Sequence, residues 1–170
     1  NAGSYTATAT PTANYQWNTT SNKTSAQNVT CKINAYNLSN ATIASTSSTP
    51  YTGSAIKPTP AVTVPIPSGK TTTLTSGTHF TYSYANNTNA GTATITITGT
   101  GNYTGTKSST FTITRKEIAV PTCTAKTYSG SSQTLFTSGT GYTAGGTTSA
   151  TNAGTYTATA TPTSNYQWNT

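Results

Sequence analysis

Few side chains in this sequence could carry out chemistry. Glu117 is the single acidic residue and His79 the single histidine, and they lie 38 positions apart. One carboxylate and one imidazole at this separation form no recognisable acid–base pair or catalytic triad. A metal site would need more ligands than this histidine and two distant cysteines, Cys31 and Cys123. We therefore expect no enzymatic activity, no metal and no cofactor, and we interpret Glu117 as a solvated charge at a module junction.

Charged residues are as rare as reactive ones. They make up 5% of the 170 residues, against roughly 25% in an ordinary soluble protein, so the hydroxyl and amide groups of Thr, Ser and Asn are expected to solvate the surface. The net charge of +7 comes from scattered lysines without a basic cluster. We therefore expect no nucleic-acid binding, while a weak attraction to anionic cell-wall polymers is compatible with the charge.

The composition also bears on location. No apolar run is long enough to span a membrane, and two cysteines in a chain of this kind suit an extracellular protein at the cell surface. The sequence begins without a methionine or a signal peptide, so we expect a processed product or a segment of a longer protein.

A turn followed by a strand occurs three times. Asn-Ala-Gly stands at residues 1–3, 89–91 and 152–154, and Asn and Gly both tolerate the positive φ that turns use. After the second copy, residues 92–98 alternate small or aliphatic side chains with threonine. A period of two is typical of a half-buried β-strand.

The chain also contains a longer duplication. Residues 1–17 reappear nearly letter for letter as residues 152–168, at an offset of 151. This predicts a tandem array of units of about 151 residues, of which the sequence holds one period and an overlap.

The repeats divide the chain into three parts. We expect residues 1–33 to be the C-terminal part of a short module, residues 34–114 a complete long module, and residues 115–170 a short module that lacks its last strand. Residues 29–33 alternate apolar and polar side chains and supply that strand in the first copy. Residues 62–64, followed by prolines at 65 and 67, predict an edge strand or the end of one. No segment shows helical periodicity, and short strands between turn signals indicate β-sandwiches.

Several motifs carry a family resemblance. They are Tyr-Thr-Gly at 51–53, Ile-Lys-Pro at 56–58, residues 74–84, Asn-Ala-Gly-Thr-Ala at 89–93, the glycine-rich residues 99–105 and Phe-Thr-Ile at 111–113. In these the long module resembles the immunoglobulin-like tandem repeats of large bacterial cell-surface proteins and adhesins. The short module has Tyr-x-Gly, Asn-Ala-Gly-x-Tyr and Asn-Tyr-x-Trp from residues 128, 152 and 165, and resembles the related MBG-type repeat.

The resemblance implies an all-β fold of tandem immunoglobulin-like β-sandwich modules of two alternating types. It also implies surface stalks or fibres, but it specifies no ligand. This chain has Thr, Ser and Asn at positions where such repeats often have Asp, Glu or Lys.

A cysteine near each end is common in the MBG-type repeat. Cys123 lies near the start of the short module, and Cys31 lies in the last strand of its preceding copy, so the repeat offset places a partner about 59 residues after Cys123. We expect a disulfide between the first and last strands of one short module, which pairs each cysteine with the equivalent cysteine of a neighbouring repeat or chain. The alternatives are a direct Cys31–Cys123 bond across the long module, two reduced buried thiols, and strand donation, in which residues 20–33 complete the short module of another chain.

The aromatic residues allow two interpretations. Trp17 and Trp168 follow Asn-Tyr-Gln in both copies, and could be a sugar-stacking platform or an indole that covers the core or an edge. We favour the second, because a small sandwich needs a large apolar anchor. His79 alternates with Phe80 and is expected to face solvent. The remaining aromatic side chains at alternating positions are expected to point inward: Tyr5, Tyr156, Phe80, Tyr82, Tyr84 and Phe111.

The sequence contains many Asn-x-Ser/Thr sequons, which a sequence rich in Thr and Asn also generates by chance. In an organism with N-glycosylation, sugars on several of them would replace charge as the solubilising layer. The candidate sites are Asn18, Asn22, Asn28, Asn37, Asn40, Asn86 and Asn102.

We therefore expect a structural repeat of an extracellular fibre, stalk or adhesin at the cell surface, whose partners are adjacent repeats of the same protein or identical subunits. One alternative is an adhesin module that binds cell-wall or host glycans or a host protein. The other is a strand-donating subunit of a self-assembling filament.

Overall fold

The computed structural model describes residues 1–19, 21, 23–66 and 69–169. It is nearly all β, with 45% of residues in strands and 2% in helix, which confirms the predicted all-β class. The one helix among these residues is the 3-10 turn η1 (Leu38–Asn40), which Asn37 caps by accepting the Ser39 N–H at 2.9 Å. The strands are β1 (Gly3–Ala9), β2 (Gln27–Ile33), β3 (Tyr36–Asn37), β4 (Thr42–Ile43), β5 (Thr49–Pro50), β6 (Val62–Pro65), β7 (Thr71–Thr73), β8 (Phe80–Ala85), β9 (Gly91–Gly99), β10 (Tyr103–Thr104), β11 (Thr106–Thr114), β12 (Lys116–Ile118), β13 (Gln133–Thr134), β14 (Tyr142–Gly146), β15 (Ser149–Ala150), β16 (Ala158–Pro162) and β17 (Tyr166–Trp168).

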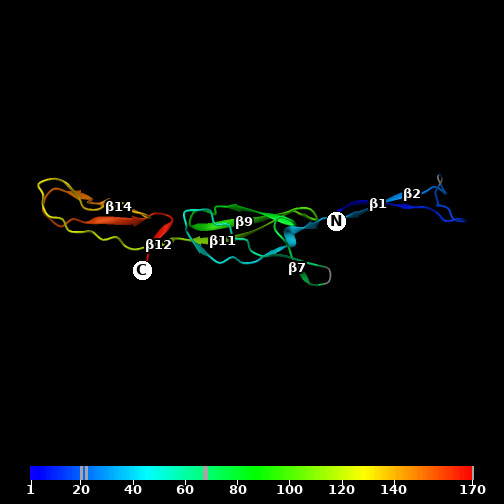
Figure 1. Cartoon of the computed structure of the whole chain (residues 1–170), viewed down its shortest axis with the longest axis horizontal. Coiled ribbons are helices and arrows are strands. Elements are labelled where there is room, and N and C mark those ends of the chain that lie inside the picture. Colours follow the sequence, from blue (N-terminus) through cyan, green and yellow to red (C-terminus); the bar gives the residue numbers. More distant parts are fainter. Residues whose placement is uncertain (20, 22, 67–68, 170) are drawn as a thin grey trace. The chain divides into compact units, whose positions relative to one another are not determined.

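The strand predicted at residues 92–98 lies inside the largest sheet. It is β9, which pairs with β8 on one side and β11 on the other in the order β5-β11-β9-β8. Figure 1 shows β9 beside β11. Ala93, Ile95 and Ile97 are buried, whereas the threonines between them are partly exposed. The period of two in the sequence therefore marks the buried face of this strand.

The chain forms two compact units. The first comprises residues 1–43, 61–83 and 96–108, and the second comprises residues 44–60, 84–95 and 109–170. Strands β8, β9 and β11 contribute residues to both. The core of the first unit consists of Leu38, Ala41, Val62, Val64, Leu74, Phe80 and Ile97. The buried side chains of the second unit are Ala93, Ile95, Phe111 and Ile113.

A three-stranded antiparallel sheet, in the order β4-β6-β7, supplies part of the first core. The interpretation of residues 62–64 as an edge strand is wrong, because β6 pairs on both sides. Pro65 is its last residue, opposite Thr71, so the missing N–H of proline falls at the strand end, as the alternative interpretation expected. Pro67 lies outside the described residues.

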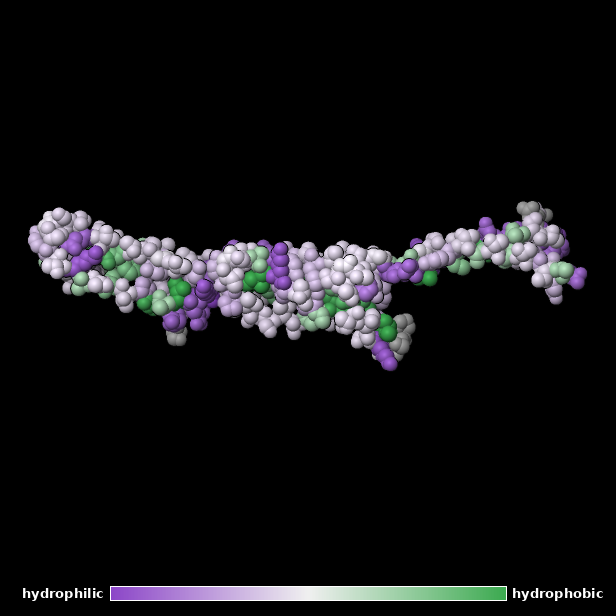
Figure 2. All heavy atoms as spheres, viewed as in Figure 1, coloured by the Kyte–Doolittle hydropathy of each residue, from purple (hydrophilic) through white to green (hydrophobic). Residues whose placement is uncertain are grey.

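Short strand pairs make up residues 115–169. β12 pairs with β17 in parallel, while β13 pairs with β15 and β14 with β16 in antiparallel fashion. None of the described residues after Ile113 is buried, and none before Leu38 is. Figure 2 shows a surface mostly of intermediate hydropathy, with few strongly hydrophilic residues, as the scarcity of charge predicts.

Candidate functional site

The residues with reactive side chains have structural partners. His79 is partly buried, its Nδ1 accepts the Thr75 N–H at 2.9 Å, and its ring centroid lies 5.2 Å from that of Tyr103. The expectation that it faces solvent is therefore wrong, because the ring fixes the turn before β8. Glu117 is exposed, 3.5 Å from the Gln167 amide that donates to it. Within the described part of the chain, no three His, Cys, Asp or Glu side chains are grouped to hold a metal.

Both thiols are free and exposed. Cys31 lies in β2, directly opposite Tyr5 of β1, and Cys123 lies in the segment between β12 and β13. The chain therefore contains no Cys31–Cys123 disulfide, and its thiols are not buried. Pairing of each cysteine with a neighbouring repeat or chain stays a prediction.

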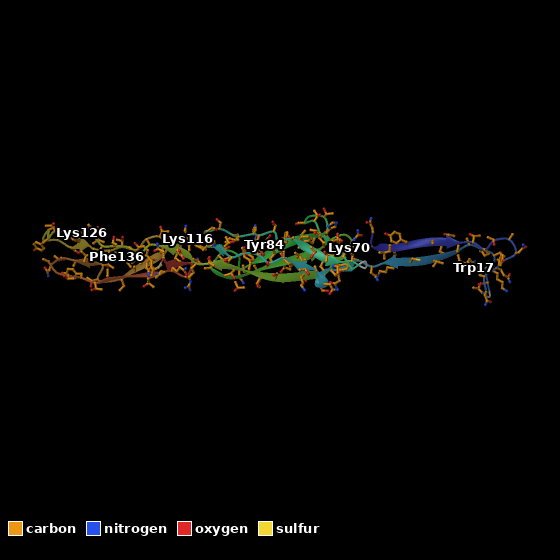
Figure 3. All side chains as sticks on the ribbon, turned by 90° about the horizontal axis from the view of Figure 1, so that it is seen from below. Trp17, Lys70, Tyr84, Lys116, Lys126 and Phe136 are labelled. Carbon is orange, nitrogen blue, oxygen red and sulfur yellow. The ribbon has the colours of Figure 1, made fainter. Side chains whose placement is uncertain are left out.

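Cys123 borders a groove in the second unit. The groove has a volume of about 350 Å³, and Lys126 and Phe136 mark this part of the chain in Figure 3. Tyr128 is 62% exposed and Tyr156 39% exposed. The walls of the groove include Cys123, Lys126, Tyr128, Leu135, Asn152 and Tyr156.

Strand β16 (residues 158–162) lies beside this groove, and none of the described strands pairs with its second edge, which we call its free edge. It pairs with β14 in a sheet of two strands. The strand that follows the second Asn-Ala-Gly, β9, pairs with β8 on one side and with β11 on the other. Strand β16 thus has the equivalent of the first neighbour and lacks the equivalent of the second.

The other copy of this strand, β1, has the opposite arrangement. All seven residues of β1 pair with β2 in antiparallel register, from Gly3 opposite Ile33 to Ala9 opposite Gln27. The apolar side chains of this hairpin remain in contact with water, since Tyr5 is 45%, Val29 51% and Ile33 56% exposed. No second sheet of the described residues buries this apolar face. A two-stranded hairpin is marginally stable by itself, so we expect this one to need such a layer.

The predicted structural aromatics differ in burial: the two tryptophans are partly buried, whereas Tyr5 and Tyr156 are exposed. Trp17 lies in the loop that joins β1 to β2, partly buried, and its Nε1 donates to the Ser25 carbonyl at 2.9 Å (Figure 3). Trp168 is partly buried in β17, with its ring centroid 5.9 Å from that of Tyr142. Tyr5 and Tyr156 do not point into a core in this chain, and their hydroxyls donate to the carbonyls of Asn1 and Asn152. Phe80 and Phe111 are buried as predicted.

Six of the seven sequon asparagines can be placed, and all six are exposed: Asn18, Asn28, Asn37, Asn40, Asn86 and Asn102. Asn22 lies outside the described residues. Three of the six side chains are engaged, because Asn28 accepts from Thr8 at 2.9 Å, Asn37 caps η1, and Asn102 holds a turn. A sugar on Asn28, Asn37 or Asn102 would have to coexist with these hydrogen bonds.

The side chain of Asn102 holds the first Asn-Ala-Gly turn. Ala2 donates its backbone N–H to Oδ1 of Asn102 over 2.7 Å, and Asn102 donates from Nδ2 to Oδ1 of Asn1 over 3.1 Å. The carbonyl oxygen of Asn102 accepts the Tyr36 N–H at 2.9 Å. One asparagine therefore binds the Asn-Ala-Gly turn before β1 with its side chain and strand β3 with its backbone.

The side chain of Asn165 holds the second Asn-Ala-Gly turn in the same way. Ala90 donates its N–H to Oδ1 of Asn165 over 2.8 Å, and Asn165 donates from Nδ2 to Oδ1 of Asn89 over 3.1 Å. The carbonyl oxygen of Asn165 accepts the Lys116 N–H at 2.9 Å, at the start of β12. The two junctions thus share the same three hydrogen bonds.

The sequence did not predict the hydrogen bonds of these two asparagines: Asn102 was interpreted as a sequon, and Asn165 as the start of the Asn-Tyr-x-Trp motif. A signal was present, because Thr-x-Asn-Tyr occurs at residues 12–15, 100–103 and 163–166, as often as Asn-Ala-Gly. In each copy, which we call an Asn-Tyr turn, the Tyr N–H donates to the Thr carbonyl three residues earlier, over 3.0, 3.1 and 2.9 Å.

Comparison with protein-family models, with curated proteins and with solved structures finds no match to this chain. Among the described residues, no helix has the length and apolar character needed to cross a membrane.

Proposed function

We propose that this chain is a structural repeat of an extracellular cell-surface fibre, stalk or adhesin, built from immunoglobulin-like β-sandwich modules of two alternating types. The observation that carries the proposal is the distribution of buried side chains. In the described part of the chain, all of them lie between Leu38 and Ile113, inside the long module. The short module has a groove and a free strand edge in place of a core, so it lacks the apolar burial that offsets the loss of chain entropy.

The strand that completes the short module is one with the sequence of β2. Residues 154–160 repeat β1 with a single change, Ser4 for Thr155, and β1 pairs with β2 over its full length. A β2 strand on the free edge of β16 gives the order β14-β16-β2, which matches β8-β9-β11 in the long module. Its apolar face would then cover the groove.

The cysteines fit this arrangement. Cys31 belongs to the added strand and Cys123 borders the groove. Transfer of an oxidised disulfide, such as that of glutathione, to these two thiols forms one S–S bond and releases two reduced thiols. The bond would add roughly 2–4 kcal/mol to the stability of the completed module, and it suits an oxidising extracellular setting.

A peptide of residues 25–35 tests this proposal. The full chain is incubated with the peptide and oxidised glutathione, and the mixed disulfides are mapped by mass spectrometry. We expect the peptide cysteine to bond to Cys123 in preference to Cys31, because Cys123 borders the groove that the peptide would cover, whereas β1 is already paired with the β2 strand of its own chain. We also expect the amides of β16 to become protected from hydrogen exchange.

The matched control is the same peptide with Val29→Asp and Ile33→Asp, which keeps the thiol and removes the apolar face. It is expected to label both cysteines slowly and to protect no amides. Equal labelling of Cys31 and Cys123 by the original peptide, without protection of β16, would refute strand completion.

Two observations favour the adhesin alternative over other second candidates. Tyr128 and Tyr156 both border the groove and are both exposed, and aromatic rings of this kind stack on sugars. Saturation-transfer NMR with oligosaccharides of cell walls and host glycans tests it, with Tyr128→Ala as the variant. Transfer to the sugar that disappears in the variant supports binding, and its absence leaves the structural role.

The strand can come from the next repeat of one polypeptide or from an identical subunit. Native material analysed after reduction and denaturation separates the two cases. One very long polypeptide indicates a tandem array, whereas chains of one repeat that form disulfide-linked ladders only before reduction indicate a self-assembling filament.

A further inference from the structure

The chain contains three Asn-Ala-Gly turns and three Asn-Tyr turns. Hydrogen bonds among the described residues join two of each. The turn at residues 1–3 binds Asn102, and the turn at residues 89–91 binds Asn165. In the described part of the chain, nothing accepts the N–H of Ala153. Likewise, no described residue is hydrogen-bonded to the side-chain amide of Asn14, whose Asn-Tyr turn lies in the loop between β1 and β2.

The joined and unjoined copies differ in backbone conformation although their sequences are nearly the same. Gly91 and Gly3, in joined turns, have φ of +139° and +158°, whereas Gly154 has no positive φ. Asn14 has a φ of +76°, whereas Asn165, in the same Asn-Tyr-Gln-Trp sequence, has no positive φ. The same local sequence therefore has one conformation when its hydrogen-bond partner is present and another when it is absent.

The type of partner follows from the order of the two joined pairs. The short-module turn at residues 1–3 binds a long-module Asn-Tyr turn, and the long-module turn at residues 89–91 binds a short-module one. The turn at residues 152–154 belongs to a short module and repeats residues 1–3 letter for letter. Its partner should therefore have the sequence and shape of residues 100–103.

We propose that residues 152–154 form a junction site that binds the Asn-Tyr turn of a further long module, supplied by the adjoining repeat. The Ala153 N–H donates to Oδ1 of that copy of Asn102, whose Nδ2 donates to Oδ1 of Asn152. The backbone carbonyl of that copy of Asn102 still accepts the Tyr36 N–H from β3 of its own module, as in the present chain. Every module junction in the fibre is then held by one bidentate asparagine, in addition to the covalent linker.

An amide side chain suits this role in a chain with few charges. It presents one acceptor and two donors, so it can satisfy the backbone N–H and the carboxamide oxygen of the turn together. No ionised group takes part, so the junction is expected to be insensitive to salt. The inference rests on the proposed function for the source of its partner, and the experiment below separates the two.

The test uses the full chain extended by one further copy of residues 20–170, with amide hydrogen exchange measured by NMR. In the single chain, Ala2 and Ala90 are expected to exchange slowly and Ala153 quickly. In the extended chain, Ala153 is expected to slow about tenfold, because a hydrogen bond of ordinary net strength changes the opening equilibrium by about that factor.

Two variants of the extended chain show which atoms are responsible. Asn102→Ala in the second copy is expected to restore fast exchange at Ala153. Asn34→Ala in the same copy is the matched control and should leave it slow, since Asn34 is exposed and its side chain has no hydrogen bond to a described residue.

Gly154→Ala provides an independent variant. In the single chain a Cβ added at residue 154 would come no closer than 3.4 Å to the Tyr156 side chain, and the backbone φ of Gly154 is not positive. The fold is therefore expected to tolerate the substitution. In the extended chain it should restore fast exchange at Ala153, because the joined conformation of Gly91 has a φ that alanine rarely adopts.

The Cys123 disulfide in the extended chain distinguishes the possible failures. Fast exchange at Ala153 with a disulfide between Cys123 and the second copy of Cys31 would overturn the junction site and leave strand completion standing. Fast exchange at Ala153 without that disulfide would overturn both.

Discussion

Gly99→Ala tests the close approach of β9 to the backbone of Tyr103 and Thr104. This approach positions Asn102, which binds the Asn-Ala-Gly turn at residues 1–3. Gly99 is the last residue of β9, and a Cβ built on it would lie 2.6 Å from the Thr104 nitrogen and 2.7 Å from the Tyr103 carbonyl carbon. Ordinary contacts of this kind are about 3.5–4.0 Å, so the methyl group would overlap by roughly 1 Å. Both atoms belong to the backbone, so no side-chain rotation can relieve the overlap.

The expected cost is about 1–3 kcal/mol from overpacking, reduced by about 0.4–1 kcal/mol because alanine restricts the unfolded chain. The backbone φ of Gly99 is not positive, so no further strain is expected. We therefore expect a net loss of about 1–2 kcal/mol. The turn that presents Asn102 should loosen with it, because the Gly99 N–H donates to the Gly105 carbonyl at 2.9 Å.

Native-state hydrogen exchange is the appropriate assay, because a chain with two units is not expected to unfold in one step. A loss of about 1–2 kcal/mol predicts that the β9 and β11 amides exchange roughly 5–30 times faster. Thr98→Ala, at the exposed neighbouring position, is the control and should change exchange by less than about threefold. Unchanged exchange of β9 in Gly99→Ala, within a factor of two, would refute the argument from backbone overlap.

Three further substitutions test other parts of the structure. Phe80→Ala should destabilise the first core by about 3–5 kcal/mol, measured by amide exchange, since Phe80 is 1% exposed. His79→Ala should cost about 1 kcal/mol in the same assay by leaving the Thr75 N–H without its acceptor. Burial raises the pKa of the Tyr84 hydroxyl above 10.0. The protonated hydroxyl therefore contributes fully to the stability of the fold below about pH 10, and this contribution is lost as the pH rises through the raised pKa. Tyr84→Phe removes the 2.7 Å hydrogen bond from the tyrosine hydroxyl to the Pro58 carbonyl. Urea titrations should therefore show that the variant loses about 0.5–1.5 kcal/mol of unfolding free energy at neutral pH. At alkaline pH the unfolding free energy of the variant should fall less than that of the original chain.

The sequence by itself determined the local features of this protein. The alternation in residues 92–98 identified β9 and its buried face, because side-chain direction in a strand depends only on the parity of the position. The Asn-Ala-Gly turns could be predicted because turn chemistry is set by a few adjacent residues. The duplication of residues 1–17 is visible directly in the sequence. The alternation of apolar and polar side chains in residues 29–33 likewise predicted a strand, which is β2.

Only the tertiary structure decided which distant segments meet. It placed β6 between two neighbours, although the prolines at positions 65 and 67 of the sequence suggested an edge, and it directed the His79 ring toward the backbone N–H of Thr75. It also revealed the free edge of β16 and the use of Asn102 and Asn165 as bidentate ligands of Asn-Ala-Gly turns. An asparagine in a polar sequence carries no mark of its partner, because its amide can bond to any exposed backbone group that packing brings within reach.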